Sequence, residues 1–129
     1  MRIPFESGDH LSINRADPSV EDLLVVVDVR TRGFTGHIDT WILRAAWLDF
    51  CERLELLEAH RQGDAIVESI SPGELRLTFR STDRAGHMAV EGSIGHRGTL
   101  GEVLLTFSPV PFDPSALPGL LRDAREIAG

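Results

Sequence analysis

Residues 40–62 read TWILRAAWLDFCERLELLEAHRQ and form the longest segment with helical periodicity, holding both tryptophans and the only cysteine. Steps of four, three, four and three positions place the main apolar residues on one helical stripe: Leu43, Trp47, Phe50, Leu54 and Leu57. Cys51 widens this stripe as a small buried apolar group. We expect Asp39 or Thr40 to cap the helix and Gly63 to follow it. The other apolar segments are short and strand-like, so this helix is the element against which a sheet packs.

Some large apolar side chains of this segment do not belong to the stripe. Leu48 and Leu56 lie off it, and one buried stripe does not also accommodate Trp41 and Ile42. An interface with a partner protein or with a second copy would cover them. A thick core between two helices would cover them equally well.

Short strand-like segments precede and follow the helix. Leu23–Thr31, LLVVVDVRT, is apolar on both faces in its first half, which indicates a central strand. Residues 10–15 alternate between polar and apolar and predict a short first strand. A further short strand is expected to begin at Phe34, and residues 65–69 predict a brief strand or an extended link.

The clearest pattern beyond the helix is a hairpin over residues 75–94. Apolar and polar residues alternate along residues 75–80, and residues 83–86, DRAG, suit a four-residue hairpin loop. If residue 82 faces residue 87 across this loop, then Phe79 pairs with Val90, Leu77 with Gly92 and Leu75 with Ile94. The polar face of this hairpin is then predicted to carry Arg76, Thr78, Arg80, His87, Glu91 and Ser93.

The C-terminal third predicts one more strand and a second helix. In residues 102–110 the inward set is expected to be Val103, Leu105 and Phe107, and Pro109 either ends the strand or places it at a sheet edge. Pro118 lies in the following amphipathic stretch, so the regular helix is expected to start near it. The whole chain, residues 1–129, is predicted to form one α+β domain. We expect an antiparallel sheet of about five or six strands, one long helix packed on a face of it and a second helix at the C-terminus.

Composition and charge exclude several classes of function. The chain has 129 residues, 42% of them hydrophobic, and a formal net charge of -7, which disfavours a general nucleic-acid binder. One cysteine excludes an internal disulfide. The N-terminus lacks the apolar run of a signal peptide and no stretch approaches a membrane span. We therefore expect a cytoplasmic protein with no membrane partner.

No motif for catalysis or for a cofactor is present. The histidines lack the local spacing of a metal site, there is no nucleophile elbow or phosphate-binding loop, and the chain contains no lysine. We therefore expect no catalytic residue, metal or cofactor, although an enzymatic role stays open. The candidate binding face is the polar hairpin face, with Arg76, Arg80, His87 and Glu91.

The order of these segments resembles the WapI-type immunity proteins and related small bacterial proteins. The likeness is carried by residues 33–36 (GFTG), a helix with Trp41 and Trp47, residues 75–79 (LRLTF), residues 86–90 (GHMAV), residues 105–107 (LTF) and a C-terminal helix. These motifs are structural, so no functional residue is transferred. The resemblance implies an antitoxin-like protein that binds a toxin domain.

Two hypotheses of different classes follow. The first is a non-catalytic protein-binding module, of the immunity or antitoxin type, that presents an acidic surface to a basic partner; a homodimer is compatible with it. The second is a small-ligand-binding or enzymatic domain that uses the polar sheet face. A deep pocket beside that face would favour the second hypothesis.

Overall fold

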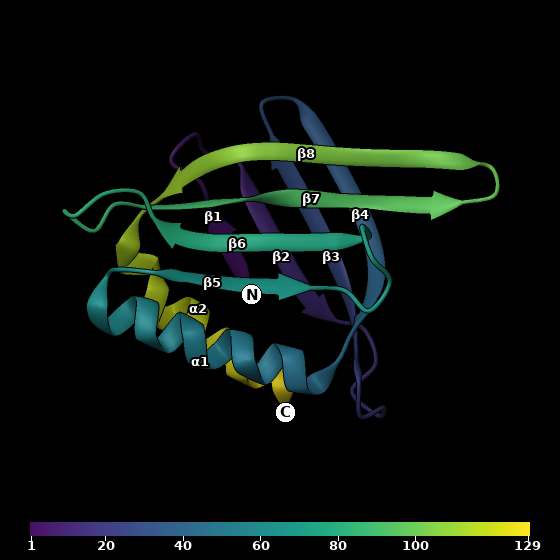
Figure 1. Ribbon diagram of the computed structural model, residues 1–129, viewed down its shortest axis with the longest axis horizontal. Helices are drawn as coiled ribbons and strands as arrows, with labels where there is room; N and C mark the ends of the chain where they lie inside the picture. Colours follow the sequence, from purple (N-terminus) through teal and green to yellow (C-terminus); the bar gives the residue numbers. More distant parts are fainter.

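The computed structural model describes all 129 residues and contains eight strands and two α-helices (Figure 1). The elements, in chain order, are β1 (Arg2–Pro4), β2 (His10–Arg15), β3 (Leu23–Thr31), β4 (Phe34–Ile42), α1 (Arg44–His60), β5 (Asp64–Glu68), β6 (Leu75–Ser81), β7 (Met88–Gly98), β8 (Gly101–Phe112), a 3-10 turn (Pro114–Ala116) and α2 (Leu117–Ala128). The strands form two antiparallel sheets, ordered β1-β2-β3-β4 and β5-β6-β7-β8. The α+β class is therefore confirmed.

The arrangement of the layers differs from the single sheet of five or six strands that was predicted. Figure 1 shows the two sheets one behind the other, with their strands running in different directions and α1 lying along β5 beside α2. The sheets separate because α1 interrupts the chain between β4 and β5, so no short hairpin joins these two strands. The missed strand, β1, has only three residues, too few to show an alternating pattern.

The predicted strand segments and the hairpin register are confirmed. β2 and β3 have the expected bounds, and β5 covers residues 65–68 of the segment 65–69 that was predicted after the helix. The three hairpin pairs are those predicted, namely Phe79 with Val90, Leu77 with Gly92 and Leu75 with Ile94. The alternation decides this register because a slip by one residue would turn every apolar side chain of β6 towards solvent.

The helix begins later than predicted because β4 extends into its expected first turn. Thr40 pairs with Val25 and Ile42 pairs with Leu23, so β4 runs to residue 42 and both of these β4 side chains are buried. The expected cap at Asp39 or Thr40 is therefore wrong. The residue before the helix supplies no side-chain cap. Instead, Oδ1 of Asp22, in the β2–β3 loop, accepts the hydrogen bond of the Arg44 amide.

The C-terminal end of α1 also differs in detail. The left-handed residue that ends the helix is Arg61, with φ of 57°, and its amide donates to the Leu57 carbonyl at 2.8 Å. Gly63, the residue expected in this role, adopts a positive φ of 98° two positions later. The chain therefore turns through two left-handed residues before it enters β5.

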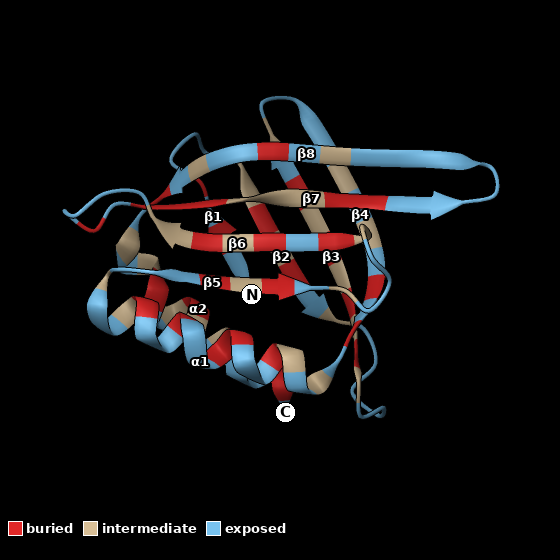
Figure 2. Ribbon diagram, viewed as in Figure 1, coloured by how far each residue is buried: buried red, intermediate tan, exposed pale blue.

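The core lies between the two sheets and is closed on one side by the helices (Figure 2). A chain of aromatic rings crosses it, with centroid distances of 5.2 Å from Trp47 to Phe50, 5.6 Å from Phe50 to Phe79 and 6.1 Å from Phe79 to Phe112. The indole nitrogen of Trp47 donates to the Ala124 carbonyl at 2.8 Å, which ties α1 to α2. Cys51 is 3% exposed, as expected for a small apolar group of the stripe.

Two contacts join the sheets at β4. A side chain at Gly36 would place its first carbon 2.5 Å from Cδ1 of Ile94 and 2.9 Å from Cδ2 of Leu105, so only glycine allows this approach. The buried hydroxyl of Thr40 donates to Oε2 of Glu74 at 2.6 Å. The bond satisfies a polar group that would otherwise be buried without a partner.

The C-terminal part follows the prediction with one exception. Pro118 lies in the first turn of α2, where its missing amide hydrogen costs nothing. β8 is an edge strand that continues through Pro109 and Pro111. The prolines therefore mark a sheet edge and do not end the strand. Val103, predicted to face inward, is exposed because this end of the β7–β8 hairpin reaches beyond the rest of the protein (Figure 1).

Candidate functional site

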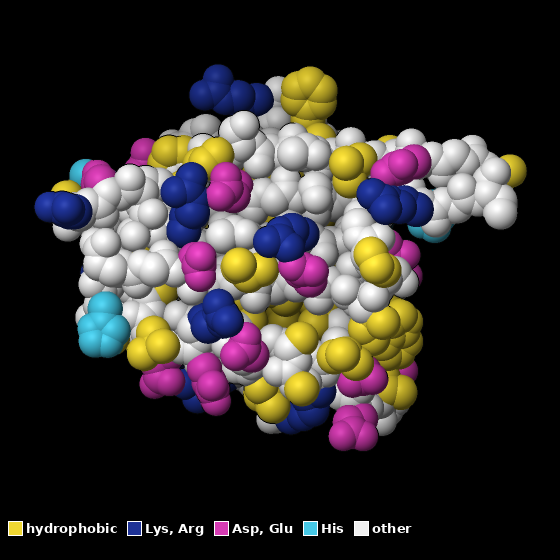
Figure 3. All heavy atoms as spheres, viewed as in Figure 1, with side chains coloured by type: hydrophobic (Ala, Val, Ile, Leu, Met, Phe, Trp, Pro, Cys, Tyr) yellow, Lys and Arg dark blue, Asp and Glu magenta, His cyan; other side chains and the backbone are white.

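The outer face of the β5–β8 sheet carries three of the four predicted binding residues. Arg76, Arg80 and Glu91 lie on the face opposite the buried side chains of β6 and β7, and basic and acidic groups alternate over this surface (Figure 3). Thr78 and Glu91 are register partners. The polar face that the alternation predicted is therefore present as a surface.

The charges on this face are paired within the protein. Nε of Arg80 donates to Oε1 of Glu91 at 2.8 Å, and the guanidinium of Arg76 forms an ion pair with Glu68 on β5. These pairs are at least about one-third exposed, so each contributes little to stability, about 0–1 kcal/mol. Each pair offsets the charge of its arginine, while the guanidinium keeps further N–H donors.

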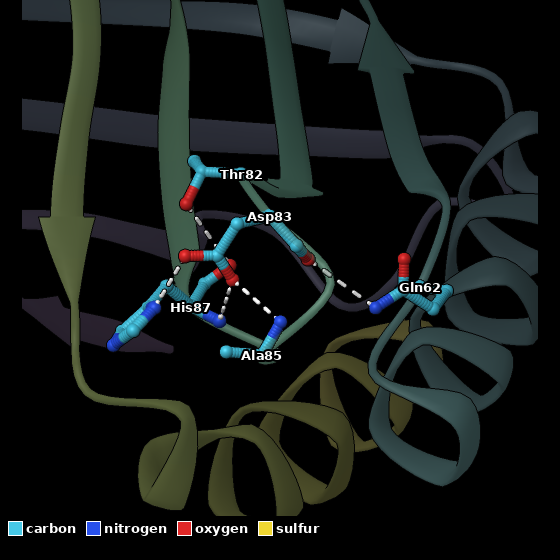
Figure 4. Close-up of polar contacts among 5 residues, drawn as sticks. All are labelled: Gln62, Thr82, Asp83, Ala85 and His87. Carbon is cyan, nitrogen blue, oxygen red and sulfur yellow. Dashed lines mark hydrogen bonds and ion pairs between the residues drawn. The ribbon is translucent and has the colours of Figure 1, made fainter.

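His87 does not lie on this face. It precedes β7 in the loop after β6, and its Nδ1 is 2.6 Å from Oδ2 of Asp83 (Figure 4). The same carboxylate accepts the amides of Ala85 at 2.9 Å and His87 at 3.2 Å, while the Asp83 carbonyl accepts from Gln62 at 3.3 Å. The side-chain hydrogen bond from His87 is the main reason why the pKa of Asp83 is lowered. These contacts stabilise the turn, and the structure separates His87 from the other three residues.

The depressions at the surface are open rather than enclosed. The one beside Arg76 and Glu91 has a volume of about 350 Å³ and is otherwise lined by strand residues of β6, β7 and β8. A larger groove of about 610 Å³ lies between the β3–β4 turn and β8. No group of three or more histidine, cysteine or carboxylate side chains is placed to hold a metal ion. Burial raises the pKa of the Cys51 thiol, which makes this residue a poor nucleophile.

A second surface, at the corner where β4 passes into α1, combines exposed apolar groups with acidic ones. We define the corner surface by five residues: Trp41, Leu43, Ile70, Asp22 and Asp39. The first three are 43%, 50% and 47% exposed. Figure 3 shows hydrophobic side chains gathered at the lower right, over the junction of β4 and α1, with acidic side chains beside them.

The backbone holds the corner surface in place. Trp41 is the register partner of the half-buried Leu24 on β3, and its carbonyl accepts the amide of Ile70 at 2.8 Å. Oδ1 of Asp22 accepts the amide of Arg44 at 3.1 Å, which fixes the start of α1 against the β2–β3 loop. The apolar groups are therefore presented by paired strands and a helix start, and their positions are well defined.

The acidic groups of the corner surface have no basic partner. Neither Asp22 nor Asp39 forms an ion pair with any basic side chain of the chain, and the same is true of the nearby Glu21.

Among the apolar side chains that did not fit the helical stripe predicted for residues 40–62, Trp41 and Leu48 are exposed and Ile42 is buried. The sequence thus indicated Trp41 but not the acidic residues beside it. Asp39 lies two positions before Trp41 on β4, where a helix cap was expected, and Asp22 comes from the distant β2–β3 loop.

Comparison with known proteins adds no relative to these observations. No family model, no curated protein and no solved structure matches the chain. The resemblance to the WapI-type immunity proteins therefore stays a prediction. Neither helix combines the length and the apolar character that crossing a bilayer requires.

Proposed function

We propose that this chain is a non-catalytic protein-binding module of the immunity or antitoxin type, and that its corner surface binds a basic partner protein. The observation that carries the proposal is the half-exposed Trp41, which lies on a paired strand with unpaired carboxylates close by. We propose a toxin domain as the partner, because this is the partner that the resemblance implies.

The chemistry of the corner surface suits such a role. Tryptophan is enriched among the residues that dominate the energy of protein interfaces, since it buries a large rigid area at a small entropic cost. Unpaired carboxylates around such an anchor attract a basic partner, raise the association rate and disfavour acidic competitors. The net charge of -7 adds a favourable long-range field for the same class of partner.

The alternative, a small-ligand-binding or enzymatic domain, has less support. Its site would be the polar sheet face, but Arg76 and Arg80 are engaged in ion pairs there and His87 belongs to a turn. A ligand anion that approached these arginines would meet charges that neighbouring carboxylates already offset. We therefore propose the binding role and treat the alternative as an outcome of its test.

The test is affinity capture from lysate of the source cells, with wild-type protein, Trp41→Ala and a control, Leu56→Ala, as baits. Leu56 is 57% exposed near the far end of α1, so its truncation removes a similar exposed apolar group from another surface. We expect a stoichiometric protein with a basic domain, bound by the wild type and the control and lost with Trp41→Ala. Its retention should weaken as salt is raised, because the contact is partly electrostatic.

A functional arm separates an immunity protein from another binding protein. The captured partner is expressed alone and together with each bait, and cell growth is measured. We expect the wild type and Leu56→Ala to restore growth and Trp41→Ala to fail. A partner that both variants capture equally well would remove the corner surface from the proposal. Failure of the wild type to capture any protein, with a metabolite stabilising it instead, would support the ligand-binding alternative.

A further inference from the structure

The outer edge of β8 is the longest sheet edge that the protein leaves open. Two four-stranded sheets have four edges. β1 has only three residues, β5 lies along α1, and the nine residues of β4 take part in one outside backbone bond, from the Ile70 amide to the Trp41 carbonyl. β8 has 12 residues, and Figure 1 shows it as the upper strand of its sheet, away from both helices, with the β3–β4 turn reaching above it.

The backbone hydrogen bonds confirm that this edge is free. Outside its ladder with β7, β8 takes part in a single backbone bond, from the amide of Glu6 to the carbonyl of Pro111 at 3.0 Å. No side chain bonds to its backbone. The outward amide and carbonyl groups of residues 101–107 therefore have no partner in the chain, and such a row of groups is a template for another strand.

The side chains along the same segment do not protect it. Natural edge strands are commonly guarded by charges, prolines or bulges. Here Pro109 and the register shift after Phe107 guard only the C-terminal end of β8. Residues 103–112 contain no charged side chain, and the free end of the hairpin exposes Leu100, Val103 and Leu104.

We propose that residues 101–107 of β8 pair antiparallel with the same segment of a second copy of this chain, so that the two β5–β8 sheets form one continuous sheet across a two-fold axis. A second copy is the occupant that the charges favour. A partner drawn by the acidic surface would be basic, and the only charge that this segment offers it, that of Glu102, is already paired with Arg97. Antiparallel pairing of the segment with itself places Glu102 opposite Thr106 of the second copy, so no like charges face each other in a chain of net charge -7.

The shape of the hairpin permits this pairing. The free end of the β7–β8 hairpin projects beyond the rest of the chain, and its residues are exposed on all sides (Figure 2). Two copies can therefore align their β8 edges without contact between their helices. The corner surface lies at the junction of β4 and α1, at the lower right in Figure 1, whereas β8 runs across the top of its sheet. Self-association through β8 therefore leaves the corner surface accessible.

The test measures mass in solution against protein concentration by sedimentation equilibrium, for the wild type, Val103→Lys and a control, Leu56→Lys. Both variants add one positive charge at an exposed apolar position, but only the first lies on the β8 edge. We expect a dimer for the wild type and the control. Val103→Lys should raise the dimer dissociation constant at least about tenfold, because it brings two like charges together across the axis.

Hydrogen exchange locates the interface independently. The amides of residues 101–107 should exchange more slowly at high concentration than at low concentration, with no such change along the exposed face of α1. Circular dichroism of each variant establishes that the fold is retained. A wild type that stays monomeric overturns the proposal, as does a dimer in which these amides show no concentration-dependent protection or which both lysine variants weaken equally.

Discussion

Truncating Phe79 tests the core directly. This side chain is fully buried and lies between Phe50 and Phe112, at centroid distances of 5.6 Å and 6.1 Å. Phenylalanine-to-alanine changes in cores cost about 3–5 kcal/mol of unfolding free energy. Aromatic pairs add about 0.5–1.5 kcal/mol each beyond their buried area, which places Phe79→Ala at the upper end, about 4–5 kcal/mol.

The assay is urea unfolding followed by tryptophan fluorescence, in which the buried Trp47, with its ring centroid 5.2 Å from that of Phe50, reports the loss of the core. With a denaturant dependence of about 2 kcal/mol/M, the midpoint should fall by about 2 M urea. Thr78→Ala is the matched control on the outer face of the same strand and should cost less than about 1 kcal/mol. Equal, small losses from both variants would refute the burial pattern of β6. If the alanine variant does not fold, Phe79→Leu reports on the same position with a smaller loss.

Three other predictions concern the backbone, the thiol and the pH dependence. Gly92→Ala should lower the unfolding free energy by about 3 kcal/mol or more, because φ is +156° and the added carbon would lie 2.0 Å from a backbone carbonyl oxygen of β6. Cys51 should be alkylated slowly in the native protein, at a rate that still rises above pH 9.0, because burial raises the pKa of its thiol above that value. Asp83→Asn should destabilise the protein at neutral pH, as urea unfolding will show. This deficit should shrink as the pH falls below 3.8, because the wild type loses the contribution of a carboxylate whose pKa is depressed in the folded state.

Each of these predictions has its own control. Gly119 lies in α2, and a carbon added there would meet only the end of the Arg122 side chain, at an ordinary contact distance of 3.7 Å. Gly119→Ala should therefore not destabilise, and an equal loss from both glycine variants would contradict the argument from close approach. For Cys51, the alkylation rate in urea gives the accessible reference, and a native rate equal to it would contradict burial. An Asp83→Asn deficit that stays constant from neutral to acid pH would contradict the lowered pKa of Asp83.

Local patterns in the sequence were sufficient for the individual elements. The four-residue loop and the alternation in residues 75–80 together placed the hairpin in its correct register, because the loop sets which residues face each other and a slip by one residue would separate the apolar faces. The stripe containing Trp47 and Phe50 indicated the buried side of α1 for the same kind of reason. The start of α1 was misplaced because residues 40–42 suit a helix by periodicity, and only their pairing with β3 makes them a strand.

The candidate sites also contain some residues that the sequence identified and others that it did not. The sequence identified a polar face with Arg76, Arg80 and Glu91, since the residues on one face of a strand follow from alternation alone. It also included His87, which the structure places in the loop before β7, because the position of a loop side chain depends on its partners, in this case Asp83. The groove between the β3–β4 turn and β8 had no sequence signal, since its walls come from distant segments.

The sequence by itself determined the class of the fold, most of the strands, the long helix and the acidic charge, because each depends on the order and type of neighbouring residues. Only the tertiary structure decided that the strands form two sheets, that Ile42 is buried while Trp41 is exposed, and that the edge of β8 stays open. The physical reason is that burial and backbone pairing depend on which distant element covers a residue. Neighbours along the chain do not specify that element.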